Sequence, residues 1–385
     1  MSYLKRAQVD PQGIPSVLPK MVHVNLLLEG IESRMAEIIR QEMVFVGADA
    51  VATPSTAGQG PDGADVILTG TLRQIRSFAE RIAAQPFGME RLAERIGGII
   101  GNVFCPSPHL RTSRREIRLG ERTLIMGILN VTPDSFSDGG RFTSPERAVE
   151  EGIRMAEQGA DIIDIGGEST RPGSESVSVD EELERVIPVV RGLAGKIDVP
   201  LSIDTMKGAV AREALREGAE IVNDVSSMGF DETMAETVAE AGAALVLMHM
   251  RGMPKTMQTG DLTYPSLWGE VIGFLQERIQ KAEAAGVDTG KIAVDPGLGF
   301  GKTAQDNLRL IRELEELKVL GRPILIGPSR KAFVGHITGA GVGERMEGTA
   351  AVVTAAILNG SQIVRVHDVK AMKKVSMMAD ALARA

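Results

Sequence analysis

Polar residues end a repeated series of short apolar segments in the second part of the chain. An apolar run closes on Asn130 and gives way to a loop rich in Asp, Ser and Gly, and most later runs also close on polar residues. Carboxylates and an amide that share one closed rim are costly unless they meet hydrogen-bond donors. A flat heterocycle with an amino group and ring N–H groups would supply these donors, and a lysine could meet its carbonyl oxygen. The residues at these ends are Asp164, Asp204, Asn223, Met248, Asp295, Ser329, Lys331, Arg365 and His367.

A second group of polar residues indicates an anion site. Asn130 ends the first apolar run, whereas Arg365 and His367 end the last one. The first and last strands of a closed barrel are neighbours, so these three side chains would gather. Arginine with histidine favours a phosphate. One ligand with a polar heterocycle at one end and a phosphate at the other would satisfy both groups.

Each residue also has a simpler structural interpretation. An aspartate at a strand end can cap the next helix. Asp224 and His249 can be hydrogen-bonded core residues, and Met248 can either fill the core or form a flat floor for a ring. The coincidence of polar residues at nearly all eight ends favours a site.

The elements that must position these residues alternate between strand and helix. The apolar segments are short and rich in Ile, Val and Leu, which is typical of parallel strands buried on both faces. Eight such units predict an α/β protein with a (β/α)8 barrel, whose active site lies at the carboxyl ends of the strands. A doubly wound sheet would show a glycine-rich dinucleotide loop after its first strand, and GILNVTPDSF is no such loop. The predicted strands are Leu124–Val131, Asp161–Gly167, Pro200–Thr205, Glu220–Ser226, Ala244–Met250, Ile292–Gly299, Pro323–Arg330 and Ile363–Asp368.

Two long polar loops follow the first and second strands. Loops of this kind can close over a substrate and exclude water, although ordinary connections look similar. They supply groups for a second pocket, namely Asp134, Phe136 and Ser137 in the first loop and Thr170, Arg171 and Pro172 in the second.

The pattern of strands and helices in residues 1–110 predicts a separate small α/β domain before the barrel domain of residues 111–385. Cys105–Thr123 reads as a linker that runs into a lead-in strand, and the charged run Arg111–Arg118 reads as a solvated surface. The predicted elements of the first domain are a strand at His23–Glu29, a helix at Ile31–Val46, a strand at Asp65–Thr69 and helices at Leu72–Ala84 and Met89–Val103.

The composition limits the class of protein. A net charge of −8 over 385 residues argues against a general nucleic-acid binder. Cys105 is the only cysteine, so the chain can form no internal disulfide. The amino terminus lacks the apolar core of a signal peptide, and no apolar run reaches membrane-spanning length. We therefore expect a cytoplasmic protein without membrane or nucleic-acid partners.

The ordered motifs resemble those of the dihydropteroate synthase family. The resemblance covers about residues 115–385 and rests on GILNVTPDSFSDGG, IIDIGGESTRPGS, LSIDT, IVNDVS, LMHMRGMPKTMQ, VDPGLGFGK, GPSRKAFVG and VRVHDV. It implies condensation of 6-hydroxymethyl-7,8-dihydropterin pyrophosphate with p-aminobenzoate, with Mg²⁺ as cofactor, sulfonamides as competitors and a homodimer formed through late barrel helices. One departure is Ala332, where many members have Ser.

The resemblance also implies roles for residues. Pterin binding is implied for Asp164, Asp204, Asn223, Met248, Asp295 and Lys331, pyrophosphate binding for Asn130, Arg365 and His367, and p-aminobenzoate binding for Thr170, Arg171, Pro172, Phe300 and Ser329. Asn130 would also help to hold Mg²⁺, and Asp134, Phe136 and Ser137 would belong to a closing loop. The implied catalytic residues are Asp204, Lys331, Arg365, Thr170 and Arg171.

Two other functions fit a pterin-type barrel. A methyltetrahydrofolate-dependent methyltransferase would share the pterin-holding Asp and Asn residues but lack the SRK and STRPG motifs, which this chain has. A non-catalytic barrel would have lost an anion-site or loop residue, and none is missing. The amino-terminal extension could be a regulatory or partner-binding module, or a stabilising appendage.

Overall fold

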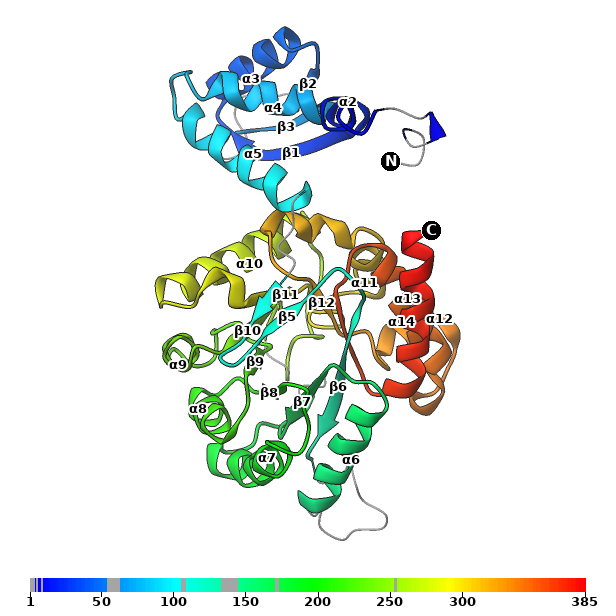
Figure 1. Cartoon of the computed structure of the whole chain (residues 1–385). Helices are drawn as coiled ribbons and strands as arrows, with labels where there is room; N and C mark the ends of the chain where they lie inside the picture. The colour runs from blue at the N-terminus through cyan, green and yellow to red at the C-terminus, as the bar shows by residue number, and fades with distance from the viewer. Residues whose placement is uncertain are drawn as a thin grey trace. The chain divides into compact units, whose positions relative to one another are not determined.

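The computed structural model of the chain divides into two units, Met1–Cys105 and Pro106–Ala385 (Figure 1). It describes residues 4, 6–7, 10–53, 63–104, 109–132, 145–169, 173–252 and 255–385, without the side chain of residue 342. The division falls five residues before the boundary expected from the sequence. β4 (His109–Arg111) belongs with the second unit because the Arg111 guanidinium lies 2.6 Å from the Asp288 carboxylate there.

Within the described residues, eight parallel strands form the core of the second unit. They lie in the order β11-β10-β9-β8-β7-β6-β13-β12. An isolated parallel bridge between Val294 of β11 and Ile324, just before β12, brings the two ends of the sheet together. This confirms the predicted (β/α)8 barrel. The strands are β6 (Leu124–Asn130), β7 (Ile162–Gly166), β8 (Leu201–Asp204), β9 (Ile221–Asp224), β10 (Ala244–Met248), β11 (Ile292–Asp295), β12 (Leu325–Ile326) and β13 (Ile363–Val366).

Helices surround these strands (Figure 1). Side-chain caps fix several helix starts: the Ser178 hydroxyl accepts from the Glu181 N–H, and Thr303 forms a reciprocal capping box with Asp306. Among the described residues, no helix is both long and apolar enough to cross a membrane. The α-helices of this unit are α6 (Pro145–Glu157), α7 (Val179–Leu193), α8 (Gly208–Glu217), α9 (Met234–Ala241), α10 (Leu267–Ala284), α11 (Ala304–Arg312), α12 (Ala332–Thr338), α13 (Met346–Leu358) and α14 (Val369–Arg384), with 3-10 turns η1 (Thr289–Lys291), η2 (Leu314–Leu320) and η3 (Val342–Glu344).

The barrel interior changes from apolar to polar along the strands. Side chains alternate along a strand, so positions two apart share the inner face. On β7 the buried Ile162 precedes the buried Asp164, and on β9 Ile221 precedes Asn223. The amino-terminal half of the interior is therefore filled with apolar side chains, and the polar residues form a layer at the carboxyl end.

A β-hairpin contributes to the amino-terminal half of this interior. β4 pairs antiparallel with β5 (Glu116–Arg118), and Leu110 and Leu119 belong to the same apolar cluster as the inward residues of the barrel strands. Arg115 forms an ion pair of 2.7 Å with the buried Glu220. The charged residues of Arg111–Arg118 are exposed, as expected for a solvated surface. The contact of Arg115 with Glu220 is an addition that the sequence does not reveal.

In the described part of the first unit, an antiparallel sheet in the order β1-β3-β2 carries helices. Its core includes Ile39, Met43, Leu68, Ile75 and Phe78. The sequence-based interpretation missed β2, which is short and has one buried position, and α2, which contains two prolines. The elements are α2 (Ile14–Met21), β1 (His23–Ile31), α3 (Ser33–Phe45), β2 (Asp49–Ala52), β3 (Ala64–Thr71), α4 (Leu72–Ile82) and α5 (Met89–Phe104).

Candidate active site

An arginine between two aspartates forms the centre of the polar layer. The Arg365 Nε atom, from β13, lies 2.6 Å from Oδ2 of Asp164 on β7, and its Nη2 atom lies 2.5 Å from Oδ2 of Asp204 on β8. Asp164 is fully buried, and Asp204 is 7% exposed. The sequence predicts that these residues lie at strand ends, but it does not predict that they touch. In the structure, the expected pyrophosphate residue Arg365 and the expected pterin residues Asp164 and Asp204 form one network.

Several buried oxygen atoms in this layer lack partners. The Asn223 amide donates to Asp164 Oδ2 at 3.1 Å. Among the described residues, Oδ1 of Asp164, Oδ1 of Asp204 and the Ser202 hydroxyl have no hydrogen-bond partner. Buried polar atoms normally have a partner, so these atoms indicate where a donor-rich ligand would bind. Sequence reasoning missed Ser202, although its position two residues before Asp204 places it on the same face of β8.

Burial raises the pKa of two carboxyl groups in the polar layer, those of Asp204 and Asp295. It raises the pKa of Asp204 to about 7, with Arg365 opposing the rise and Asp164 adding to it. It likewise raises the pKa of Asp295 to about 6, although the Gly297 N–H and the Lys331 ammonium favour the ionised form. These values lie near neutrality, which is common for groups at functional sites.

A wall of sulfur and aromatic side chains lies beside the carboxylates. Met248 and Phe300 belong to one buried cluster with Met206, Val225 and Met257. The Lys331 Nζ atom lies 4.2 Å from the centroid of the Phe300 ring, a cation–π distance. The structure thus brings together the expected pterin residues Met248 and Lys331 and the expected p-aminobenzoate residue Phe300.

The remaining anion-site residues lie on the same rim. The His367 Nδ1 atom is 2.9 Å from the Ser329 hydroxyl, which links the ends of β13 and β12. Asn130 ends β6 and is half-buried. A Cβ added at Gly166 would lie 3.9 Å from Asn130 Oδ1 and 3.6 Å from Asp204 Oδ2, so both oxygen atoms flank this glycine.

Six predicted residues cannot be placed. The loop residues Asp134, Phe136, Ser137, Thr170, Arg171 and Pro172 lie outside the described residues.

Two other polar residues have structural contacts. Asp224 accepts from the backbone N–H groups of Ser226 and Met228 at 2.8 and 2.7 Å, which fits its simpler interpretation as a turn residue. His249 is buried against Lys302, with 2.8 Å between Nδ1 and Nζ. Lys302 is the last residue of the VDPGLGFGK motif, but its burial could not be predicted, because lysines are seldom buried.

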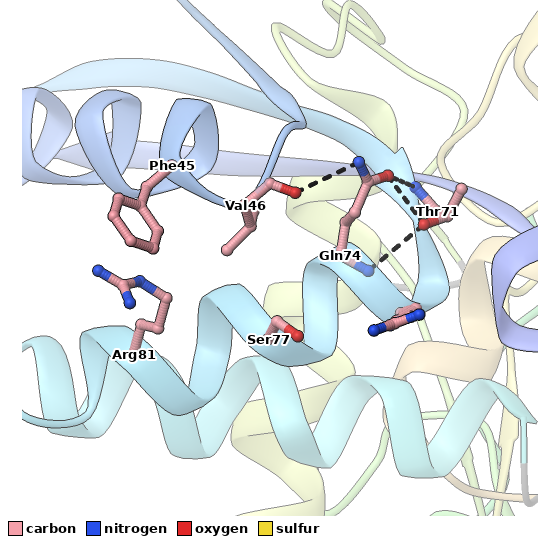
Figure 2. Close-up of a pocket in the computed structure, with 7 residues that line it drawn as sticks. Phe45, Val46, Thr71, Gln74, Ser77 and Arg81 are labelled. Atoms are coloured by element: carbon pink, nitrogen blue, oxygen red, sulfur yellow. Dashed lines mark hydrogen bonds between the residues drawn. The ribbon is translucent and has the colours of Figure 1, made fainter. Parts of the chain in front are cut away.

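The first unit contains a separate open cavity of about 520 Å³ (Figure 2). Arg81 is held there by a 2.6 Å ion pair with Glu42 and lies over the Phe45 ring, at 3.6 Å from its centroid. The Gln74 side-chain oxygen accepts a hydrogen bond from the Thr71 N–H in the capping box of α4. Because these groups are already paired, the barrel rim remains the candidate active site. The cavity is lined by Phe45, Val46, Thr71, Arg73, Gln74, Ser77 and Arg81.

Comparison with known proteins identifies the family of the barrel. The family model described as pterin binding enzyme matches residues 126–367, which cover the strands from β6 to β13. A dihydropteroate synthase of Synechocystis is 50% identical over 279 residues, which are 72% of this chain and 96% of that protein. A crystal structure of Xanthomonas albilineans dihydropteroate synthase with 4-aminobenzoic acid superimposes with a TM-score of 0.68 and 44% identity, and the match covers 72% of this chain and 99% of that one.

A longer match extends into the first unit. A probable bifunctional folylpolyglutamate synthase/dihydropteroate synthase of Halobacterium salinarum is 39% identical over 366 residues, or 95% of this chain and 44% of that protein. The amino-terminal unit therefore has a counterpart in at least one relative. Because the family model and these relatives match the barrel, the chain belongs to the dihydropteroate synthase family of pterin-binding enzymes.

Proposed function

We propose that the barrel joins 6-hydroxymethyl-7,8-dihydropterin pyrophosphate to p-aminobenzoate, giving 7,8-dihydropteroate and pyrophosphate. The observation that carries the proposal is a pair of buried oxygen atoms, on Asp164 and Asp204, that have no hydrogen-bond partner among the described residues. The amino and ring N–H groups of a pterin are donors for such atoms. Asn223 and Asp295 widen this acceptor surface, and Lys331 can donate to the pterin carbonyl oxygen.

The pyrophosphate group would bind beside the pterin. The Arg365 guanidinium holds the two aspartates through Nε and Nη2 and has further N–H groups to offer a phosphate oxygen. Asn130 ends β6 and His367 directly follows β13, and these two strands pair in parallel. A cationic and amide donor set of this kind stabilises the negative charge that develops on a leaving pyrophosphate.

The reaction would then follow from charge. The bond between the methylene carbon and the pyrophosphate oxygen breaks, and pyrophosphate leaves with the electron pair. The carboxylates of Asp204 and Asp295 stabilise the cationic pterin that remains. The neutral arylamine attacks the methylene carbon and loses a proton, so no strong general base is needed. The loops after β6 and β7 would keep water from the cation.

Mg²⁺ is part of the proposal. Magnesium prefers oxygen ligands, keeps several waters and often binds through one or two protein oxygens together with substrate phosphates. The described residues contain no group of three or more metal-binding acidic, His or Cys side chains. The amide oxygen of Asn130 fits a site that substrate phosphates complete. When bound, the ion would neutralise charge on the leaving pyrophosphate.

We also propose that the chain forms a homodimer through its last barrel helices. Large apolar side chains are exposed on α13 and α14, where a partner would cover them. Sedimentation should show a dimer, and Leu358→Asp combined with Met377→Lys should give a monomer. The exposed apolar residues there are Met346, Leu358, Met377, Met378 and Leu382.

A cytoplasmic location completes the proposal. The single cysteine supports it, because small secreted domains commonly depend on disulfides. Cell fractionation would test it.

Product identification tests the proposed reaction. Purified protein with both substrates and Mg²⁺ should form 7,8-dihydropteroate, detected by chromatography and mass spectrometry. Asp295→Asn should lower product formation, whereas Asp261→Asn, at an exposed loop position, should not. Absence of the product under these conditions would refute the proposal.

A further inference from the structure

Lys302 is an unusually buried lysine outside the residues used so far. Lys302 lies in the loop between β11 and α11, and it is 2% exposed. The Nζ atom lies 2.8 Å from Nδ1 of His249 and donates to the carbonyl oxygens of Gly297 at 3.0 Å, Phe300 at 3.1 Å and His249 at 3.3 Å. None of the ion pairs in the described part of the chain includes Lys302, so backbone carbonyls stand in place of a carboxylate partner.

The contacts of Lys302 join two segments at the carboxyl end of the barrel. His249 directly follows β10, and Gly297 and Phe300 lie in the loop after β11. The two backbones touch closely: a Cβ added at Gly297 would lie only 2.0 Å from the His249 carbonyl oxygen. Such close packing leaves carbonyl oxygens inside the protein, and the three N–H groups of the Lys302 ammonium are shared among three of these oxygens and the His249 imidazole. Burial lowers the pKa of Lys302 to about 7, with Asp295 opposing the shift, so the ammonium form prevails below this pH. Burial and the nearby Lys302 lower the pKa of His249 to about 2, so its neutral imidazole can accept from the ammonium.

The joined segments carry side chains of the candidate site. Met248 directly precedes His249, and the Phe300 carbonyl oxygen accepts a hydrogen bond from Lys302. These two side chains share a buried cluster, and the Phe300 ring lies under the Lys331 ammonium. We propose that Lys302 is a positioning residue for the condensation, which fixes the wall formed by Met248 and Phe300 against which the arylamine approaches the pterin. This inference rests on the proposed function.

Lys302→Met tests the role, because methionine retains an unbranched side chain and removes the ammonium. We expect KM for p-aminobenzoate to rise about tenfold, the effect of losing one charged hydrogen bond, with a smaller change in kcat. Lys291→Met is the matched control. Lys291 donates to the Gly242 carbonyl at 2.6 Å and joins the same two strands at their opposite ends. It should leave KM within about twofold.

A double-mutant cycle separates positioning from general stability. If Lys302 acts through Phe300, Lys302→Met should have little further effect on KM in a Phe300→Leu background. Should Lys302→Met fail to fold, His249→Gln removes a single contact of the ammonium, and a smaller rise in the same KM is expected. An unchanged KM in a folded, active variant, or additive effects in the cycle, would overturn the inference. Failure of the wild-type protein to form dihydropteroate would instead refute the proposed function.

Discussion

Replacement of Arg365 by methionine should destabilise the barrel strongly, because it leaves two buried carboxylates without their cation. Arg365 forms ion pairs with Asp164 and with Asp204. Two unit charges whose centres are about 4 Å apart attract by about 4 kcal/mol at an effective dielectric constant of ~20. Desolvation of the three groups offsets part of this attraction. Removing one partner of a buried ion pair lowers the free energy of unfolding by about 3–5 kcal/mol, and we expect a decrease in that range for Arg365→Met at pH 8.

The loss should be smaller at low pH. Burial raises the folded-state pKa of Asp204 to about 7 from the ordinary aspartate value of 3.8. A raised folded-state pKa gives stability that is present at low pH and is lost as the pH rises through the folded value. Without Arg365 this pKa rises further, so at pH 5 Asp204 takes up a proton and the penalty falls. The destabilisation by Arg365→Met should therefore increase from pH 5 to pH 8.

Urea unfolding followed by tryptophan fluorescence measures this effect. Trp268 is the only tryptophan of the chain and lies in α10, so its signal reports on the barrel and not on the first unit. Arg191→Met is the matched control, because Arg191 holds Glu217 through two bonds of 2.8 Å at an exposed position. The control should have a much smaller effect, because solvent screens an exposed ion pair. A loss no larger for Arg365→Met than for the control would refute the reasoning.

Three further predictions concern activity and the first unit. Asp204→Asn should lower kcat/KM by about 10- to 150-fold, the effect of one charged hydrogen bond, while Asp288→Asn at the surface should not. In the free enzyme, kcat/KM should fall as the pH drops through about 7 and then about 6, because Asp204 and Asp295 become protonated; a flat profile from pH 5 to 8 would contradict this. A shortened chain that begins at Pro106 should retain turnover, since the described site residues all lie in the second unit; loss of activity in a folded short form would show that the first unit takes part.

The barrel and its rim could be predicted from sequence because both follow from local patterns. The buried strands appear as short runs of Ile, Val and Leu, and the polar residue at the end of each strand necessarily faces the same rim. Asp164, Asp204 and Asn223 are therefore close in space as expected. The observed strands are shorter than predicted at their carboxyl ends, since residues such as Ser226, in the turn after β9, already belong to loops.

The contacts across the barrel could not be predicted in this way. Arg365 was expected to face only the pyrophosphate, yet it also holds two aspartates that precede it by 201 and 161 residues. Lys302 ends the VDPGLGFGK motif, but no sequence pattern reveals that its partners are backbone carbonyls and the His249 imidazole. The sequence predicts a linker and a lead-in strand where the hairpin β4–β5 lies. It does not predict the hairpin itself, since strands of three residues are too short for a period to show.

Release of pyrophosphate tests the central claim most directly. Purified protein would be given the dihydropterin pyrophosphate and Mg²⁺, with and without p-aminobenzoate, and both pyrophosphate and dihydropteroate would be measured over time. The account predicts that p-aminobenzoate accelerates pyrophosphate release and that the two products form in equal amounts. Pyrophosphate release that does not depend on p-aminobenzoate and yields no dihydropteroate would contradict it.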